Sequence, residues 1–370
     1  MKIAILADPI DNQKAGIHYY TRKLVENLGS IDSNIEYYAI LQKHHPEFEN
    51  IKQIILKPKT YIPVYKAYRM FFEIPAILKK LKIDIAVEPA HFGPFNLPEK
   101  IKRVTVIHDL TPILYPQYHV FHSQLLQRIF LKGILKKADL IITNSLYTSQ
   151  DVYKVYPFTK EKTEFIHLGK DEDIHQSQQT SEVLTKLGIN TPYLLFVGTI
   201  EPRKNLNILL KAFEAIKNEG FPKLNLVIVG QKGWKSKSFF QLYEQHPYRE
   251  NIILPGYVDR KDLSAIYTAA YAYIQPSMYE GFGLPVVEAM SCGTPCIVSD
   301  ISSLPEIGGD AVLTFNCNSL SDLESRMKDL LHNPELRDRL SKLSLERSKL
   351  FNWKFHAEKF DQLMKKLIII

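Results

Sequence analysis

The sequence has few cysteines and no long apolar run, and each shortage excludes a class of protein. Its three cysteines, Cys292, Cys296 and Cys317, cannot complete a disulfide framework, and none has a second Cys or a His at zinc-site spacing. No apolar run reaches the roughly 18 residues of a membrane-spanning helix, and the apolar start ends at Asp8, too early for a signal peptide. We therefore expect a cytoplasmic protein with no structural metal, no signal peptide and no membrane anchor.

Two glycine patterns that bind phosphate in common nucleotide-binding folds are also missing. No Gly-x-Gly-x-x-Gly follows the first apolar run, and no Gly-x4-Gly-Lys-Ser/Thr occurs in the chain, which excludes a simple dinucleotide site and a P-loop. With 45% hydrophobic and 24% charged residues, the composition is that of an ordinary globular protein. For 370 residues two domains are expected, because single cores stop growing near roughly 250–300 residues.

The excess of positive charge is small but unevenly spread. Lys and Arg number 47 and Asp and Glu 40, a net charge of +7, of which +5 falls in residues 1–180. Within this half, the stretch Lys52–Lys82 contains eight basic residues and one acid, Glu73, interleaved with aromatic residues. Clustered charge of this kind indicates an anionic ligand or surface. Its confinement to one stretch argues against nucleic acid as the partner.

Short runs rich in Ile and Val recur along the chain, and most are followed by a segment with helical spacing, which is typical of parallel sheets with crossover helices. The sequence predicts strands at 3–6, 37–41, 83–87, 104–107, 140–143, 165–168, 193–197, 224–229, 252–254, 272–274, 296–298 and 311–314. The polar segment 173–190 has the composition of a linker. We therefore expect an α/β protein with doubly wound domains at 1–172 and 191–352, followed by a helix capped by Asn352.

The loop after the run 272–274 has the composition of an anion site. Gly281 and Gly283 permit a tight turn, and Pro285 suits the first turn of a helix. The amides and the dipole of a helix N-terminus attract a phosphate. Because open α/β sheets bind ligands at the carboxyl ends of their strands, we expect this loop to face a cleft between the two domains.

Two acids flank this turn, Glu280 before it and Glu288 within the predicted helix. Carboxylates accept hydrogen bonds from pairs of hydroxyl groups, so both suit a sugar or a ribose. In the alternative interpretation Glu280 is solvated and Glu288 only complements the helix dipole.

A second loop, after the run 193–197, carries Arg203 and Lys204 just before a predicted helix. Two cations at a helix start suit a dianion such as a diphosphate, and Arg can bind two of its oxygens at once. A solvated pair of loop residues is the alternative.

In the first half, His108 and Asp109 follow the run 104–107, and Gly16 opens the first long helix. An imidazole can donate, accept or transfer a proton near neutral pH, with Asp109 orienting it or acting separately. Gly16 lets the backbone approach a phosphate. A structural histidine and an ordinary helix start are the alternatives here.

Together these residues resemble glycosyltransferase family 4, a family of retaining enzymes with the GT-B fold of two facing Rossmann-like domains. Segment 280–288 is similar to the family's Glu-x7-Glu motif. The similarity continues at the Gly16 loop, at 108–109 and at segments 140–145, 167–169, 196–205 and 351–353. The resemblance implies that the C-terminal helix, 353–370, packs back onto the first domain.

The resemblance also implies a nucleoside-diphosphate sugar as donor, bound mainly by the second domain. Arg203 and Lys204 would then hold the diphosphate. Glu288 would bind the ribose, Glu280 the donor sugar, and His108 would lie near the reacting carbon. The other implied donor contacts are Gly16, Gly198, Tyr257, Val258, Gly281, Phe282, Gly283 and Leu284. The catalytic candidates are His108, Asp109, Arg203, Lys204 and Glu280.

The implied reaction is transfer of a hexosyl unit with retention and without a metal ion, so no carboxylate nucleophile, metal or cofactor is expected. Stabilising the departing diphosphate is then the main catalytic task. Segment 108–112, His-Asp-Leu-Thr-Pro, is closer to members that build bacterial surface polysaccharides, often mannosyltransferases. We therefore predict mannosyl transfer from GDP-mannose, in preference to a UDP-sugar, to a saccharide or lipid-linked acceptor on the first domain.

Other interpretations stay open at this point. A non-catalytic nucleotide-sugar-binding subunit, a sugar-nucleotide epimerase and a phosphorylase would share the fold. Segment 62–81 of the basic stretch Lys52–Lys82 is expected to be helical and kinked at Pro75, and it has two interpretations. In the first, it contacts anionic lipid or a lipid-diphosphate acceptor. In the second, it is a solvated basic face over a buried apolar stripe. The first interpretation makes the protein peripheral on the cytoplasmic face of the membrane.

Overall fold

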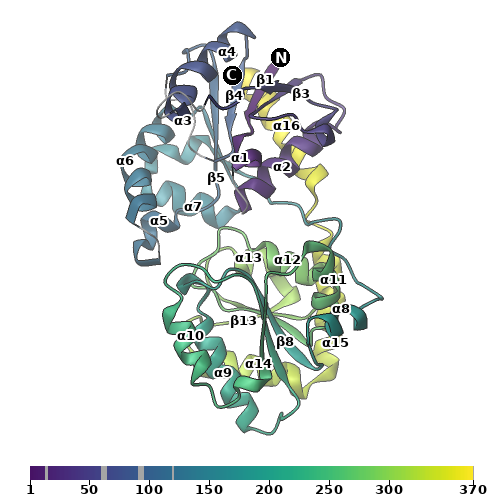
Figure 1. The fold of residues 1–370 in the computed structure, drawn as a ribbon. Coiled ribbons are helices and arrows are strands. Elements are labelled where there is room, and N and C mark those ends of the chain that lie inside the picture. The colour runs from purple at the N-terminus through teal and green to yellow at the C-terminus, as the bar shows by residue number, and fades with distance from the viewer. Residues whose placement is uncertain (13–15, 60–64, 91–95, 119–120, 370) are drawn as a thin grey trace. The chain divides into compact units, whose positions relative to one another are not determined.

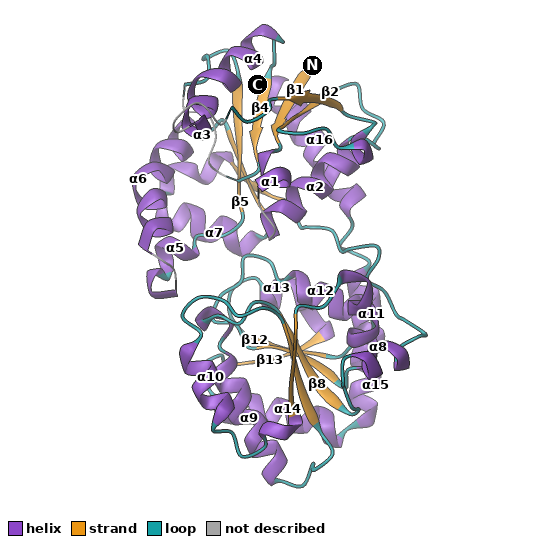
Figure 2. Ribbon diagram, viewed as in Figure 1, coloured by secondary structure: helices purple, strands orange, loops and turns teal. Residues whose placement is uncertain are grey.

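The computed structural model describes residues 1–12, 16–59, 65–90, 96–118 and 121–369. It divides into two compact units (Figure 1). Unit 1 comprises Met1–Ile113, His122–Gly169 and Asn352–Ile370, and unit 2 comprises Leu114–Phe121 and Lys170–Phe351. Each unit contains one parallel sheet with helices on both faces (Figure 2). The expected α/β architecture of two doubly wound sheets is confirmed.

Unit 1 contains a seven-stranded parallel sheet. In spatial order its strands are β3 (Lys52–Ile55), β2 (Glu36–Leu41), β1 (Lys2–Leu6), β4 (Ile85–Glu88), β5 (Lys102–Ile107), β6 (Leu140–Thr143) and β7 (Thr163–Phe165). The helices of this part of the chain are α1 (Asp8–Asn12), α2 (Gly16–Leu28), α3 (Tyr65–Tyr68), α4 (Ile74–Lys80), α5 (Thr111–Leu114), α6 (Phe121–Lys137), α7 (Leu146–Val155) and α16 (Trp353–Ile369). The winding direction reverses between β1 and β4, and such a switch point is where open sheets bind ligands.

Unit 2 contains a six-stranded parallel sheet. In spatial order its strands are β10 (Ile252–Gly256), β9 (Asn225–Val229), β8 (Tyr193–Val197), β11 (Ala272–Gln275), β12 (Cys296–Ser299) and β13 (Val312–Phe315). Its helices are α8 (Ser181–Lys186), α9 (Leu206–Asn218), α10 (Lys237–Glu244), α11 (Arg260–Ala269), α12 (Leu284–Ser291), α13 (Leu304–Gly308), α14 (Leu320–His332) and α15 (Pro334–Ser348). Here the switch point lies between β8 and β11.

The apolar composition of the strands follows from their position between two layers of helices. All five residues of β9 are buried, for example, as expected for a strand covered on both faces. The helix α9 buries the apolar stripe that its spacing predicts, Leu206, Leu209, Leu210, Phe213 and Ile216. This packing fixes the loop that precedes α9 at the carboxyl edge of the sheet.

Three parts of the chain differ from the sequence-based expectation. β3 lies inside the basic stretch Lys52–Lys82, where no strand was predicted, and it pairs with β2 at the sheet edge. Of the predicted helical segment 62–81, residues 62–64 lie outside the described residues, and the rest changes from α3 to a π-helical turn, Arg69–Glu73, before α4. Segment 173–190, expected to be a linker, contains α8 and belongs to unit 2, as do residues 114–121.

The C-terminal helix α16 belongs to unit 1 and packs beside α2 (Figure 1). Asn352 caps it as predicted, because its Oδ1 accepts from the backbone N–H of Lys354 at 2.7 Å. Asp361 of α16 accepts a hydrogen bond from the Tyr37 hydroxyl of β2 at 2.8 Å. Within the described ranges, no helix combines the length and apolarity needed to cross a membrane.

Candidate functional site

Two loops meet at the switch point of unit 2, because β8 and β11 are neighbours in its sheet. The loop after β8 ends in the short 3-10 turn Pro202–Lys204, and the loop after β11 runs to the start of α12. The backbone N–H of Met278 in the second loop donates to the Arg203 carbonyl in the first at 2.8 Å. The predicted residues Arg203, Lys204 and Glu280 are brought together by this pairing.

Glu280 is the centre of this cluster, and both of its carboxylate oxygens are hydrogen-bonded. Lys204 Nζ donates to Oε1 at 2.6 Å, and Arg203 Nη1 donates to Oε2 at 2.8 Å. Oε1 also accepts from the Ser277 hydroxyl at 2.7 Å and from the Gln275 amide at 2.9 Å. A buried carboxylate with four donors is held rigidly in one orientation.

The surroundings keep this cluster charged. Burial alone would raise the pKa of Glu280, but the charges of Arg203 and Lys204 and the hydrogen bonds outweigh it and lower the pKa to about 2. Burial lowers the pKa of Lys204, while Glu280 acts in the opposite direction. At neutral pH, Glu280 is therefore a carboxylate within an ion-paired cluster.

The interpretation of Arg203 and Lys204 as a solvated pair is wrong, since Lys204 is only 8% exposed and Arg203 is paired on two sides. Arg203 Nη2 donates to Glu201 Oε1 at 2.6 Å, and its Nη1 also donates to the Tyr279 carbonyl at 2.6 Å. Two carboxylates thus balance the two cations. The sequence did not indicate Glu201 as a partner, although it lies two residues before Arg203.

Glycine is required by the backbone at two predicted positions beside the cluster. Gly283, at the start of α12, has φ of +106°, and a Cβ there would lie 2.9 Å from Leu304. Gly198, directly after β8, has φ of +154° and would place a Cβ 3.1 Å from the Phe196 ring. Both conformations are ones that side chains disfavour. The predicted residues Gly281, Phe282 and Leu284 complete the turn into α12, where helix N–H groups lack acceptors within the helix.

Glu288 lies in a second buried cluster on α12. Tyr267 of α11 donates from its hydroxyl to Oε2 at 3.0 Å, and Arg260 Nη2 pairs with Oε1 at 3.2 Å. Arg260 also pairs with Asp171. Burial raises the pKa of Glu288, against the lowering effect of Arg260. Because Glu288 is 6% exposed and hydrogen-bonded, its role is not limited to complementing the helix dipole.

Glu280 and Glu288 do not share a hydrogen-bond partner among those resolved in the described residues, but Tyr273 of β11 lies within electrostatic range of both. Its hydroxyl is hydrogen-bonded to Gln275, and its ring packs edge-on against Tyr267 with the centroids 5.7 Å apart. Both acids therefore act electrostatically on one buried tyrosine of β11.

Two of the implied donor contacts, Tyr257 and Val258, follow β10 at the same carboxyl edge. Gly256 ends that strand with φ of +77°. Tyr257 is 67% exposed, whereas Val258 is buried. The backbone of this turn is thus anchored by one side chain and leaves the other in solvent.

In unit 1, His108 follows β5 and is partly buried. Its Nε2 lies 2.8 Å from the Pro89 carbonyl, which can only accept, so Nε2 carries the proton and Nδ1 is the acceptor. Burial lowers the pKa of His108. The Tyr20 ring of α2 packs edge-on against the imidazole, 4.8 Å between centroids.

Asp109 does not orient His108 through a resolved hydrogen bond. Its Oδ1 accepts from the backbone N–H of Thr111 at 2.9 Å and from the Thr111 hydroxyl at 2.6 Å, which forms an Asx turn into α5. Its charge does act to raise the pKa of His108. Gly16 begins α2, and a Cβ there would meet no atom of the described residues within 4 Å. Packing against this part of the chain therefore does not require glycine at position 16.

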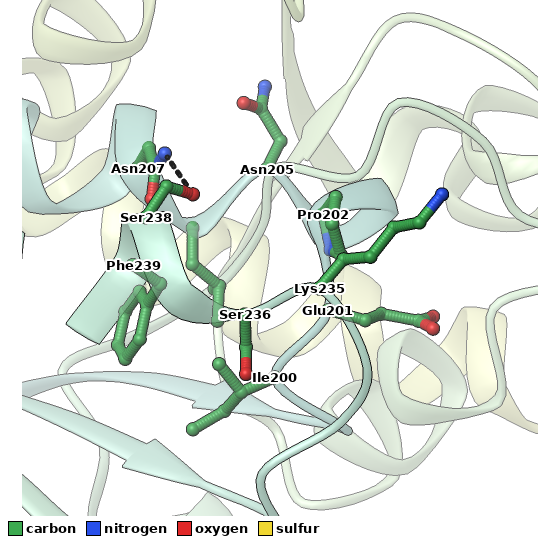
Figure 3. A pocket seen from close by; sticks show the side chains of 10 residues that line it. Ile200, Glu201, Pro202, Asn205, Asn207, Lys235, Ser236, Ser238 and Phe239 are labelled. Carbon is green, nitrogen blue, oxygen red and sulfur yellow. Dashed lines mark hydrogen bonds between the residues drawn. The ribbon is translucent and has the colours of Figure 1, made fainter. Parts of the chain in front are cut away.

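A small cavity is lined in part by Glu201 and Pro202, which precede Arg203 in the loop after β8 (Figure 3). It has a volume of about 80 Å³ and is lined by residues that include Glu201, Asn205, Lys235 and Phe239. Ligand pockets of drug-sized molecules are usually about 300–1,000 Å³, so this cavity is too small for a nucleotide sugar. In the described part of the chain, no group of three or more His, Cys, Asp or Glu side chains is placed to hold a metal ion.

Two family profiles match the chain in sequence. The profile described as "Glycosyltransferase Family 4" matches residues 15–174, and that described as "Glycosyl transferases group 1" matches residues 179–347. O-antigen chain mannosyltransferase B from Escherichia coli is 33% identical over 263 residues, which cover 70% of this chain and 69% of that protein. The chain belongs to glycosyltransferase family 4.

Two further similarities concern a second mannosyltransferase and the fold of this glycosyltransferase. The serotype-specific mannosyltransferase WbdA from Escherichia coli is 26% identical over 265 residues, and the match spans 68% of this chain but only 32% of WbdA. The crystal structure of HepE from Anabaena in complex with UDP-glucose has a TM-score of 0.77 at 15% identity and covers 99% of this chain and 100% of HepE. That likeness establishes the GT-B fold, whose two parallel sheets are those of units 1 and 2.

Proposed function

We propose that this glycosyltransferase moves a mannosyl unit from a nucleoside-diphosphate mannose, with GDP-mannose as the donor, to a saccharide or lipid-linked saccharide in surface-polysaccharide synthesis. The observation that carries the proposal is the buried Arg203, Lys204 and Glu280 cluster at the switch point of unit 2. The similarity to O-antigen chain mannosyltransferase B supports mannose as the transferred sugar.

The cluster supports a role in stabilising the leaving diphosphate. As the bond from the anomeric carbon to the phosphate oxygen breaks, negative charge grows on the diphosphate and the sugar becomes oxocarbenium-like. Lys204 has three N–H donors and uses one on Glu280, so it retains donors for a phosphate oxygen. Glu280 holds both cations in place before the donor arrives, and no reorganisation is then needed during the reaction.

The ribose is assigned to Glu288, and the base to the turn after β10. Tyr267 and Arg260 fix the Glu288 carboxylate, which can then accept hydrogen bonds from the two ribose hydroxyls. The backbone at Gly256, Tyr257 and Val258 offers amide and carbonyl groups to a base. The mannosyltransferase similarity supports mannose as the sugar, and the choice of GDP-mannose over a UDP-sugar is the first point to test.

In unit 1, His108 and Gly16 are assigned to the donor sugar and the phosphates. The neutral imidazole of His108 offers Nδ1 as an acceptor to a sugar hydroxyl. The acceptor hydroxyl attacks from the face that the diphosphate leaves, its proton passes to the leaving phosphate oxygen, and the configuration is retained. Asp109 shapes the turn after His108 instead of acting on substrate, and no metal ion takes part in this scheme.

A thermal-shift panel of nucleotide sugars tests the donor. A ligand that binds only the folded protein raises its melting temperature, so GDP-mannose should raise it and UDP-glucose and UDP-galactose should not. The Glu288→Ala and Lys204→Ala variants should abolish most of the shift. Equal shifts with UDP-sugars would overturn the choice of donor, and full mannosyl transfer by both folded variants would overturn the site.

The basic stretch supports contact with an anionic membrane surface, which would place the protein peripherally on the cytoplasmic face. Tyr68, Phe71 and Phe72 are 42%, 37% and 62% exposed, and exposed lysines follow in α4. Basic helices with exposed aromatic side chains bind anionic lipid interfaces. At low salt, the protein should sediment with vesicles that contain phosphatidylglycerol. The Phe72→Ser variant should sediment with them to a smaller extent. Equal binding to neutral vesicles would overturn this contact.

A further inference from the structure

A buried ion pair also lies at the carboxyl edge of the unit 1 sheet, and no role has yet been assigned to it. Asp8 directly follows Ala7 at the end of β1, and β1 and β4 form the switch point of this sheet. Arg69 pairs with Asp8 through Nη1, although the two residues are 61 positions apart in the chain. The pair therefore occupies the position at which an open parallel sheet binds its ligand.

Arg69 reaches this position from the π-helical turn Arg69–Glu73. Turns of this type are rare and occur frequently at functional sites. The Arg69 side chain is only 4% exposed. A long cationic side chain buried to this extent is normally fully paired.

The hydrogen bonds of this pair are incomplete. Arg69 Nε, Arg69 Nη2 and Asp8 Oδ1 are all buried, and none has a hydrogen-bond partner among the described residues. Native proteins satisfy nearly all such groups, and an unsatisfied buried one needs an explanation. Two donors and one acceptor thus lie together at a ligand-binding edge.

The combination of donors and an acceptor selects the chemistry of the ligand. A hydroxyl group both donates and accepts, so one hydroxyl can accept from Arg69 while a neighbouring one donates to Asp8 Oδ1. A phosphate only accepts and would face the carboxylates of Asp8 and of Asp11, which acts electrostatically on Asp8.

We propose that Arg69 and Asp8 form a saccharide subsite that binds adjacent hydroxyl groups of the acceptor. This rests on the proposed function, because it assigns the acceptor of that same transfer reaction. The subsite takes a neutral sugar ring, and the donor nucleotide remains assigned to unit 2.

Saturation-transfer difference NMR of the full chain with the methyl glycosides of mannose, glucose, galactose and N-acetylglucosamine tests the subsite. Wild-type protein should bind at least one of them, and Arg69→Lys and Asp8→Asn should each weaken that binding about 10- to 100-fold. Arg103→Lys is the control for the loss of a buried arginine elsewhere in unit 1, since the Arg103 side chain is also 4% exposed and pairs with the buried Glu88. If Arg69→Lys does not fold, Asp8→Asn carries the test.

Three results would overturn the subsite. Either no glycoside binds the wild type, or the variants bind the glycoside as well as the wild type does, or inorganic phosphate displaces the glycoside from the wild type but not from Arg69→Lys. A parallel thermal shift with GDP-mannose keeps the two proposals apart. If the nucleotide sugar raises the melting temperature of the wild type and both variants equally, while Arg69→Lys binds the glycoside as the wild type does, only the subsite proposal fails. If the nucleotide sugar shifts none of them, the proposed function fails first.

Discussion

Both units of this glycosyltransferase place a buried ion pair at the switch point of their sheet, but the two pairs differ in how completely they are hydrogen-bonded. In unit 2, both oxygens of Glu280 are occupied and its pKa is about 2. In unit 1, Asp8 keeps one buried oxygen without a described partner, and burial raises its pKa. Under the proposed function, the saturated cluster stabilises charge that develops in the reaction, whereas the unsaturated pair binds the hydroxyl groups of the acceptor.

The largest effect is expected from breaking the saturated cluster. Lys204→Ala leaves Glu280 buried with one cation fewer, and removal of one electrostatic group of this kind costs about 10²–10³ in rate. Breaking a buried pair also destabilises the fold by roughly 3–5 kcal/mol. Steady-state transfer kinetics and thermal denaturation measure the two effects.

The matched control for this variant is Lys217→Ala. Lys217 is also buried and lies in α9, the helix that follows Lys204. Its ammonium donates to the Leu224 carbonyl at 3.1 Å and not to a predicted site residue. It should lower the melting temperature without lowering kcat per folded molecule. A Lys204→Ala protein with wild-type kcat/KM would contradict the assigned role.

The two carboxylates should give opposite pH dependences of stability. The unfolded chain protonates Glu280 near its ordinary value of 4.5, but the folded protein only near about 2. The stability that Glu280 contributes, roughly 3 kcal/mol, is therefore present above pH 4.5 and lost as the pH falls through that window. The folded pKa of Asp8 lies above its ordinary 3.8, so its contribution is lost as the pH rises through the folded value.

Urea denaturation of the wild type, Glu280→Gln and Asp8→Asn at several pH values between 3 and 7 checks this contrast. The free energy of unfolding of the wild type minus that of Glu280→Gln should decrease as the pH is lowered. The same difference for Asp8→Asn should increase as the pH is lowered. If both differences changed in the same direction with pH, the contrast between the Glu280 cluster and the Asp8–Arg69 pair would be wrong.

A smaller effect is expected at the second cluster of unit 2. Tyr267→Phe deletes one hydrogen bond to Glu288 and should weaken nucleotide binding about tenfold, as a bond to a charged group is worth about 1.5–3 kcal/mol. Tyr193→Phe is the control, because its buried hydroxyl donates to the Ile266 carbonyl at 2.6 Å. Calorimetric titration with GDP should separate the two variants, and equal affinities would argue against a ribose at Glu288.

The smallest effects compare one glycine from each unit. Gly198→Ala forces a side chain into a disfavoured conformation and against Phe196, and should cost roughly 1–2 kcal/mol of stability. The added methyl group of Gly16→Ala meets none of the described residues within 4 Å, so this variant should leave the melting temperature unchanged while it lowers transfer activity. Unchanged transfer by Gly16→Ala would remove the phosphate role of that loop.

The sequence predicted the features that depend on neighbouring residues. The turn at Gly281 and Gly283, the cap at Asn352 and the apolar stripe of α9 each follow from a few adjacent positions. The edge strand β3 escaped prediction because it is short and lies in a basic stretch. Its lysine-rich surroundings hide the alternation by which a strand is recognised.

The partners of the site residues could not be predicted in the same way. Tyr267 and Arg260 reach Glu288 from α11, and Arg69 reaches Asp8 from 61 positions away. Such pairs are created by the packing of the sheet and leave no local pattern. The loops at the switch point of unit 2 could be found because parallel strands bring their carboxyl ends together, but which side chains then pair depends on tertiary structure.

The return of α16 to unit 1 determines the order in which the two units can be completed during synthesis. All residues of unit 2 lie between Leu114 and Phe351, so the ribosome finishes them before it reaches Asn352. Unit 1 lacks α16, which packs on α2 and holds Tyr37 through Asp361, until the residues after unit 2 have been made. Unit 1 can therefore complete its packing only after all residues of unit 2 have been synthesised.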